Sequence, residues 1–350
     1  MKRFIGKVLI FLVLFAILFV YAQNVLHYRW PDDTYSKMTD YAQQAPDSID
    51  VAVFGTSEMY AAYAPIITYA EEGITGFNFA VQNRSAMTTY YQFEYMLKHQ
   101  TPKVVVCDFV CLFDNALPGD SETVFRRVVD TMPDKKIRFD LIREICKVDP
   151  SQDFHSWYFP VFRYHSMWKE VNLQSFMWDT KRYPFYSSYQ KGGQLARSEF
   201  EGDPIEITKD LWVTDRAQDE MQEFSMQYYD RMIAECNARG IPVVCILTPK
   251  ISDAAAYASN APAMQAYFDE RGVTFLNYNT YEQVERMGLV QPDDYMDSAH
   301  LNVAGSLKFS KAVAADLKEL FSALPDRRED ARVSAVWDEE LAMFYDSYEE

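Results

Sequence analysis

Short apolar runs alternate with longer helical patterns along most of the chain. The apolar runs lie at residues 51–54, 76–81, 103–110, 241–247 and 273–278. Near-continuous Val- and Ile-rich strands separated by helices are typical of a parallel sheet that is covered on both faces. The sequence therefore predicts an α/β fold, a three-layer sandwich around a mainly parallel sheet.

The alternation is interrupted between about residues 115 and 215, where aromatic residues are concentrated. Pro160 and Pro184 interrupt this stretch, and its apolar residues do not follow the pattern of a strand. We interpret it as an aromatic-rich helical insertion, a subdomain or lid, within an α/β domain that spans residues 24–325. The aromatic side chains could pack the core of the insertion, contact a ligand, or do both. Residues 326–350 are acidic and are predicted to form a surface tail.

The N-terminus is an apolar segment preceded by the positive charges of Lys2, Arg3 and Lys7. Counted from Phe4, it has about the 20 residues that a bilayer-spanning helix requires. The positive flank favours a cytoplasmic N-terminus. We therefore expect residues 1–23 to be a single-pass anchor in the cell membrane and the remainder to be extracytoplasmic. Val20-Tyr21-Ala22 also resembles a signal-peptidase site, so secretion after cleavage is the alternative.

Composition excludes some classes of function. A net charge of −17 argues against binding of nucleic acid, because a phosphate-binding surface has to be basic. Five cysteines are an odd number, and Cys107, Cys111 and Cys245 lie in or beside apolar runs, so they are interpreted as core residues. The cysteines and histidines do not show metal-ligand spacing. Neither a metal nor a cofactor is predicted.

The first apolar run ends in Gly55-Thr56-Ser57-Glu58. In an open parallel sheet, reactive groups gather at the carboxyl ends of the strands, which is where Ser57 lies. The structural alternative is an ordinary helix cap, with Ser57 bonding a helix N–H and Glu58 near the positive end of the helix. A serine nucleophile requires a base, usually a histidine that a carboxylate orients.

Only one of the five histidines lies in a suitable position. His300 follows Asp297 by three residues, in a loop between the last predicted strand and the last predicted helix. The spacing lets the carboxylate and the imidazole approach each other on one loop. The topology would bring this loop to the same sheet edge as Ser57. The other four lie next to the N-terminal segment, at the end of a helical run or in the insertion: His27, His99, His155 and His165.

With a serine after the first strand and Asp-x-x-His before the last helix, the chain resembles the SGNH (GDSL-like) hydrolases over roughly residues 49–112 and 225–320. The anchor, the insertion and the Gly-Thr-Ser-Glu form are similar to the membrane-anchored branch, which includes the D-alanyl-transfer protein of teichoic acids and alginate acetylation proteins. The resemblance implies a flavodoxin-like sheet. It also implies Ser57 as nucleophile, His300 as base and Asp297 as its orienting carboxylate.

The same resemblance implies an oxyanion hole formed by the Ser57 backbone N–H and by Asn83, which replaces the glycine of the family. The asparagine of the third block would fall near Leu112, whose side chain cannot donate. The expected function is a serine esterase or O-acyltransferase that forms an acyl-enzyme. Trp157, Tyr158 and Trp168 are expected to be exposed for substrate or partner contacts, with His165 and Arg163 in support or in a structural role.

The predicted substrates are a cell-envelope glycan or an acylated carrier. Acyl-CoA is not present outside the membrane. Transfer by an extracytoplasmic enzyme would therefore require a multi-pass membrane partner that passes acyl groups across the bilayer. The alternative of a different class is a non-catalytic module that binds glycan or acts as a scaffold in a polysaccharide-modification assembly.

Overall fold

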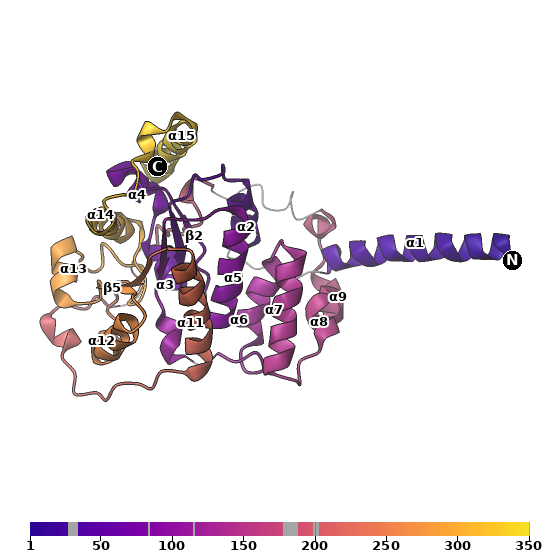
Figure 1. The fold of residues 1–350 in the computed structure, drawn as a ribbon, viewed down its shortest axis with the longest axis horizontal. Coiled ribbons are helices and arrows are strands. Elements are labelled where there is room, and N and C mark those ends of the chain that lie inside the picture. Colours follow the sequence, from indigo (N-terminus) through magenta and orange to yellow (C-terminus); the bar gives the residue numbers. More distant parts are fainter. Residues whose placement is uncertain are drawn as a thin grey trace. The chain divides into compact units, whose positions relative to one another are not determined.

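Five strands form one open sheet in the computed structural model (Figure 1). The structure describes residues 1–26, 34–82, 85–114, 116–177, 188–198, 200 and 203–349. The strand order is β2-β1-β3-β4-β5, and every neighbouring pair is parallel. This is the order of doubly wound, flavodoxin-like sheets. The predicted α/β class and parallel sheet are confirmed, with strands at Val51–Phe54 (β1), Gly76–Asn78 (β2), Val104–Cys107 (β3), Val243–Leu247 (β4) and Thr274–Asn277 (β5).

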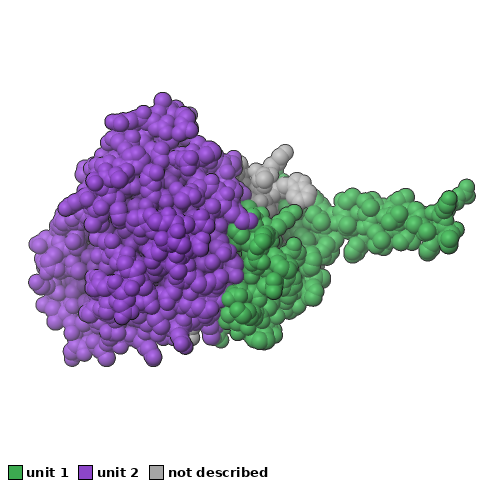
Figure 2. Space-filling view, viewed as in Figure 1, with its two compact units in different colours: residues 1–36, 118–186 green, residues 37–117, 187–350 purple. Residues whose placement is uncertain are grey.

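The chain divides into two compact units, coloured separately in Figure 2. Unit 1 comprises residues 1–36 and 118–186, and unit 2 comprises residues 37–117 and 187–350. The insertion is thus shorter than the predicted 115–215, because the segment from residue 187 onward belongs to the sheet-containing unit. The main helices of unit 2 are α3 (Ser57–Ala62), α4 (Pro65–Glu72), α5 (Ala86–His99), α11 (Glu223–Ala238), α12 (Ala254–Asp269), α13 (Tyr281–Met287), α14 (Val303–Leu320) and α15 (Ala331–Glu349).

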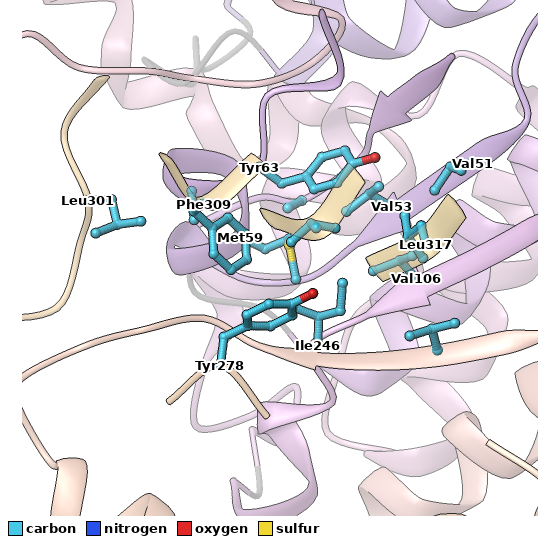
Figure 3. Packing of buried hydrophobic residues seen from close by; sticks show 14 of the residues in the cluster. Val51, Val53, Met59, Tyr63, Val106, Ile246, Tyr278, Leu301, Phe309 and Leu317 are labelled. Carbon is cyan, nitrogen blue, oxygen red and sulfur yellow. The ribbon is translucent and has the colours of Figure 1, made fainter. Parts of the chain in front are cut away.

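Alternate residues of the strands face two different sets of helices. On one face, Val53, Val106 and Ile246 pack in a buried cluster with residues of α3 and α14, including Met59 and Phe309 (Figure 3). Strand residues of the opposite phase face other helices. The ring of Phe54, for example, lies 6.1 Å from that of Phe93 in α5, and the ring of Phe275 lies 5.3 Å from that of Phe268 in α12. Helices on both faces are compatible with the predicted three-layer sandwich.

The C-terminal segment is a helix with a buried face. Val333, Trp337 and Phe344 of α15 are 3% exposed or less. The ring of Trp337 lies 5.1 Å from that of Tyr69 in α4, and the Tyr69 hydroxyl donates to Asp338 Oδ1 at 2.6 Å. The predicted surface tail is therefore part of the core packing of unit 2.

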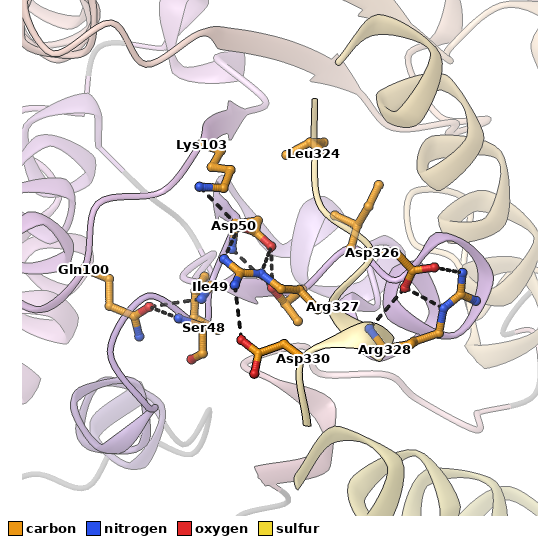
Figure 4. Close-up of polar contacts among 12 residues, drawn as sticks. Ser48, Ile49, Asp50, Gln100, Lys103, Leu324, Asp326, Arg327, Arg328 and Asp330 are labelled. Carbon is orange, nitrogen blue, oxygen red and sulfur yellow. Dashed lines mark hydrogen bonds and ion pairs between the residues drawn. The ribbon is translucent and has the colours of Figure 1, made fainter. Parts of the chain in front are cut away.

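A buried ion pair joins the start of this C-terminal segment to the amino end of β1 (Figure 4). The guanidinium of Arg327 donates to both carboxylate oxygens of Asp50 at 2.7 Å. The Asp50 side chain is only 1% exposed and also accepts a hydrogen bond from the Thr75 hydroxyl at 3.0 Å. The hydrogen bonds between Arg327 and Asp50 raise the pKa of the Arg327 guanidinium. The pair fixes the segment that leads into α15.

Replacing Arg327 by alanine is expected to lower the free energy of unfolding by about 3–5 kcal/mol, because Asp50 would remain buried without its main counter-charge. Urea denaturation of the detergent-solubilised protein measures the loss. Arg332→Ala is the matched control, since Arg332 is 73% exposed in its pair with Asp330 and should contribute about 0–1 kcal/mol. Equal effects of the two substitutions would contradict a stabilising role for the buried pair.

Unit 1 contains the N-terminal helix and a small helical body. α1 is long and apolar enough to be a single membrane span or signal anchor. The body is stabilised around Trp157, which is 1% exposed, lies 4.0 Å from the Arg126 guanidinium and donates its indole N–H to Gln152 at 3.1 Å. The helices of unit 1 are α1 (Lys2–Val25), α6 (Glu122–Thr131), α7 (Lys135–Val148), α8 (Phe154–Tyr158), α9 (Pro160–Tyr164), η2 (His165–Glu170) and η3 (Leu173–Phe176).

Candidate active site

Ser57 is the first residue of α3, and two residues, Gly55 and Thr56, separate it from the end of β1. The turn between them is fixed by Asp108, which follows β3. Its Oδ2 atom accepts hydrogen bonds from the Thr56 backbone N–H at 2.6 Å and from the Thr56 hydroxyl at 2.9 Å. A Cβ atom on Gly55 would lie 2.5 Å from this oxygen, so the turn requires glycine at that position. Asp108 belongs to no motif that predicts a role for it, although it lies at the carboxyl end of a predicted strand.

The loop that carries His300 is fixed at several points in unit 2. The Ser298 carbonyl accepts hydrogen bonds from the backbone N–H groups of Ile251 and Ser252, at 2.9 and 2.7 Å. The Met296 N–H donates to the His300 carbonyl at 3.0 Å, which closes the loop on itself. Asn302 then caps α14 by accepting from the Gly305 N–H. The loop is therefore held in one conformation by backbone contacts.

Two serines of α14 hold this helix against α3. The hydroxyls of Ser306 and Ser310 both donate to the Ala62 carbonyl, at 2.8 and 3.2 Å. Both hydroxyls are buried, and the Ser310 oxygen also accepts from the Ala64 N–H at 2.9 Å. These bonds fix the helix that begins at Ser57 relative to the helix that follows His300.

The result is a continuous hydrogen-bonded chain of three side chains. The Ser57 Oγ atom lies 2.8 Å from His300 Nε2, although 243 residues separate them. His300 Nδ1 lies 2.9 Å from Asp297 Oδ2 and 3.0 Å from Oδ1. An imidazole protonated at Nδ1 donates to Asp297 and leaves Nε2 free to accept the serine proton. The sequence predicted these three residues to meet at the carboxyl edge of the sheet, and the structure brings them together there.

Asp297 is held in its ionised form. Burial alone would raise its pKa, but hydrogen bonds from the Ala299 N–H at 2.7 Å, the His300 N–H at 2.8 Å and the imidazole outweigh burial and lower the pKa. Ionised Asp297 therefore stabilises the fold fully above the ordinary aspartate pKa of 3.8, and this contribution is lost as the pH falls through its lowered pKa.

A largely buried ion pair lies beside the serine. The Lys250 Nζ atom is 2.7 Å from Glu58 Oε1, and the two side chains are 7% and 15% exposed. The same ammonium lies 4.0 Å from the centre of the Tyr257 ring, and Thr248 lies within 3.4 Å of the second Glu58 oxygen. The sequence predicts only a capping role for Glu58 and none for Lys250, although Lys250 comes shortly after β4, at the same edge of the sheet.

The remaining predicted residues do not join this constellation. Asn83, the expected oxyanion donor, lies outside the described residues. Leu112 is fully buried in η1 (Val110–Phe113). The prediction that Trp157 is exposed is wrong, because its ring packs under Arg126 in the core of unit 1. Tyr158 is half-buried, whereas His165 and Trp168 are exposed, and all three also belong to unit 1.

Within the residues that the structure describes, no group of three His, Cys, Asp or Glu side chains could hold a metal ion. No protein-family model matches the chain, and a comparison with curated proteins finds no significant match. What supports a function for this chain is therefore the geometry of the site, together with the sequence resemblance.

Proposed function

We propose that this protein is an extracytoplasmic, membrane-anchored serine enzyme that transfers acyl groups through an acyl-enzyme on Ser57, as an esterase or O-acyltransferase of a cell-envelope glycan. The observation that carries the proposal is the hydrogen-bonded chain from Ser57 Oγ through His300 to Asp297. An ordinary helix cap would not require an imidazole on the serine oxygen and a carboxylate behind that imidazole. The resemblance to SGNH hydrolases assigns the same three roles.

In this mechanism, the Ser57 oxygen attacks the carbonyl carbon of an ester while its proton passes to His300 Nε2. The tetrahedral intermediate then collapses, and the imidazolium returns that proton to the leaving alcohol oxygen. Water or a glycan hydroxyl next attacks the acyl-enzyme, with His300 again accepting the proton and returning it to Ser57. Asp297 stays ionised, orients the ring and stabilises the imidazolium.

The oxyanion formed at the carbonyl has one donor that the topology supplies, the backbone N–H of Ser57. As the first residue of α3, Ser57 has an N–H with no acceptor within its helix. Asn83 is the second proposed donor. Leu112 supplies none, and loss of one such donor costs about 10²- to 10³-fold in rate. We therefore expect slow hydrolysis of simple esters.

The long apolar α1 supports an extracytoplasmic location, because its basic flank favours a cytoplasmic N-terminus. Outside the membrane, the acyl donor would be an acylated carrier or an envelope polymer. Transfer to a glycan would require a multi-pass membrane protein that supplies acyl groups from the other side. Hydrolysis of an acylated glycan requires no such partner.

The proposal is tested with the full-length protein in detergent and p-nitrophenyl acetate as substrate. Release of p-nitrophenol is expected from the wild type and should fall to the uncatalysed level in Ser57→Ala. Ser198→Ala, which removes an exposed serine of the same unit, should retain wild-type turnover. Equal rates for wild type and Ser57→Ala would contradict the proposal, and no turnover in either would favour the non-catalytic glycan-binding or scaffolding module.

A second experiment separates hydrolysis from transfer. The reconstituted protein is incubated with an acetylated wall polymer, alone and with an unmodified acceptor glycan. An esterase releases free acetate in both mixtures, whereas a transferase acetylates the acceptor. Acetate release without any modification of the acceptor would count against the transferase.

A further inference from the structure

The C-terminal end of α1 is built into the folded body of unit 1. The Tyr21 hydroxyl donates to the Phe176 carbonyl at 3.0 Å, and the Asn24 side-chain amide donates to the Met177 carbonyl at 3.1 Å. The Gln23 side-chain oxygen accepts from the Val161 N–H at 2.9 Å. Polar side chains in the last turns of α1 thus satisfy backbone groups of the insertion.

Aromatic packing extends this junction. The Phe19 ring lies 5.4 Å from Phe159 and 6.3 Å from Phe162, and Figure 1 shows α8 and α9 at this end of α1. Cleavage after Ala22 would remove Phe19 and Tyr21 and expose the surface that they cover. The contacts therefore favour a retained anchor over a cleaved signal peptide.

In the segment that forms this junction, unit 1 carries large apolar side chains, here named the aromatic collar and defined as half-buried Phe159 and the exposed Phe162, Trp168, Leu173, Phe176 and Met177. Trp168 is 65% exposed and Leu173 is 90% exposed. Phe162, Phe176 and Met177 are 53%, 50% and 43% exposed. Large apolar side chains exposed together within one short segment are typical of a protein or membrane interaction site.

The length of α1 fixes the depth at which the collar lies. About 20 residues span the hydrocarbon core, and this count from Phe4 ends at Gln23. Phe19 and the two collar rings that it contacts, Phe159 and Phe162, therefore lie where the acyl chains meet the headgroups, the region that tryptophan and other amphipathic aromatics prefer. Lys169, whose Nζ lies 5.8 Å from the Trp168 ring centre, is exposed and suited to lipid phosphates.

We propose that the aromatic collar is a membrane-interface belt that seats unit 1 on the outer surface of the bilayer, with phospholipid as its partner. α1 supplies the attachment, and the collar fixes the depth and orientation of the insertion at the surface. The proposal follows from the continuity of the collar with the membrane-spanning helix. It is independent of the chemistry at Ser57.

The test uses the full-length protein in phosphatidylcholine vesicles whose acyl chains carry bromine just below the headgroups. Bromine quenches tryptophan fluorescence on contact. Trp168→Phe should remove a large part of the emission that shallow bromine quenches. Trp212→Phe, a control at the end of η5 (Lys209–Trp212) in unit 2, should leave the quenched part unchanged.

A second variant, Leu173→Trp, tests the proposal independently in case Trp168→Phe does not fold. Leu173→Trp should add emission that shallow bromine quenches more strongly than bromine placed at the bilayer centre. The proposal is overturned if Trp168→Phe and Trp212→Phe lose equal quenched emission, or if the tryptophan introduced at residue 173 is unquenched in lipid vesicles. In that event a protein partner would be the better candidate for covering the collar.

Discussion

Replacing His300 by alanine is expected to lower the turnover of an activated ester by about 10⁴- to 10⁶-fold. The imidazole is the group that accepts the Ser57 proton, since its Nε2 atom lies 2.8 Å from Oγ. Without it, the hydroxyl remains protonated at neutral pH and is a poor nucleophile. Turnover of p-nitrophenyl acetate by the purified full-length protein measures the loss.

His155→Ala provides the matched control, because His155 is an exposed histidine of unit 1 whose Nδ1 atom lies 3.4 Å from a carboxylate oxygen of Asp153. It should retain wild-type turnover. Added imidazole should partly restore activity to His300→Ala if the ring acts as a base. Wild-type activity in His300→Ala would mean that another group activates the serine.

Replacing Asp297 by asparagine is expected to lower turnover by about 10⁴-fold while leaving the fold intact. The carboxylate accepts from His300 Nδ1 at 2.9 Å, which holds the imidazole with its Nε2 atom unprotonated toward Ser57. An asparagine that donates its amide N–H to Nδ1 would favour the opposite tautomer, with Nε2 protonated and unable to accept the serine proton. Initial rates with p-nitrophenyl acetate measure this effect.

Asp293→Asn is the control for the same loop, because Asp293 is exposed and contributes its backbone carbonyl to Asn302. It should change turnover little. If Asp297→Asn lost no more activity than Asp293→Asn, the carboxylate would have no part in orienting the base. Circular dichroism of both variants distinguishes a loss of activity in Asp297→Asn that comes from the missing carboxylate from one that comes from loss of the fold.

The sheet could be predicted because each buried strand is a short, nearly continuous apolar run, and such a run can be located in the sequence without knowledge of its contacts. The meeting of Ser57 and His300 followed from topology alone, since parallel strands place their carboxyl ends at one edge. Both signals are local in sequence. Their spatial consequence depends only on the order of strands and helices.

The boundaries of the insertion and the environment of Trp157 could not be predicted in the same way. Burial of Trp157 depends on Arg126, about 30 residues earlier, and no local pattern indicates that contact. The buried face of α15 did leave a signal. Val333, Trp337 and Phe344 recur at helical spacing, but the acidic composition of the segment obscured it.

The roles of Asp108 and Lys250 could not be predicted from sequence motifs. Each lies just beyond a strand at the site edge, yet its role depends on a partner more than 50 residues away, Thr56 for Asp108 and Glu58 for Lys250. Pairwise contacts of this kind are set by tertiary packing. A motif identifies the reacting groups but not the residues that fix their geometry.

The proposed function requires that His300 activates Ser57 as a nucleophile. Its most direct test is peptide mapping by mass spectrometry after treatment of the full-length protein with a fluorophosphonate, which reacts with activated serines. A single adduct is expected, on the peptide that contains Ser57, and it should be lost in His300→Ala. An adduct on a different serine, or none on the folded wild-type protein, would contradict it.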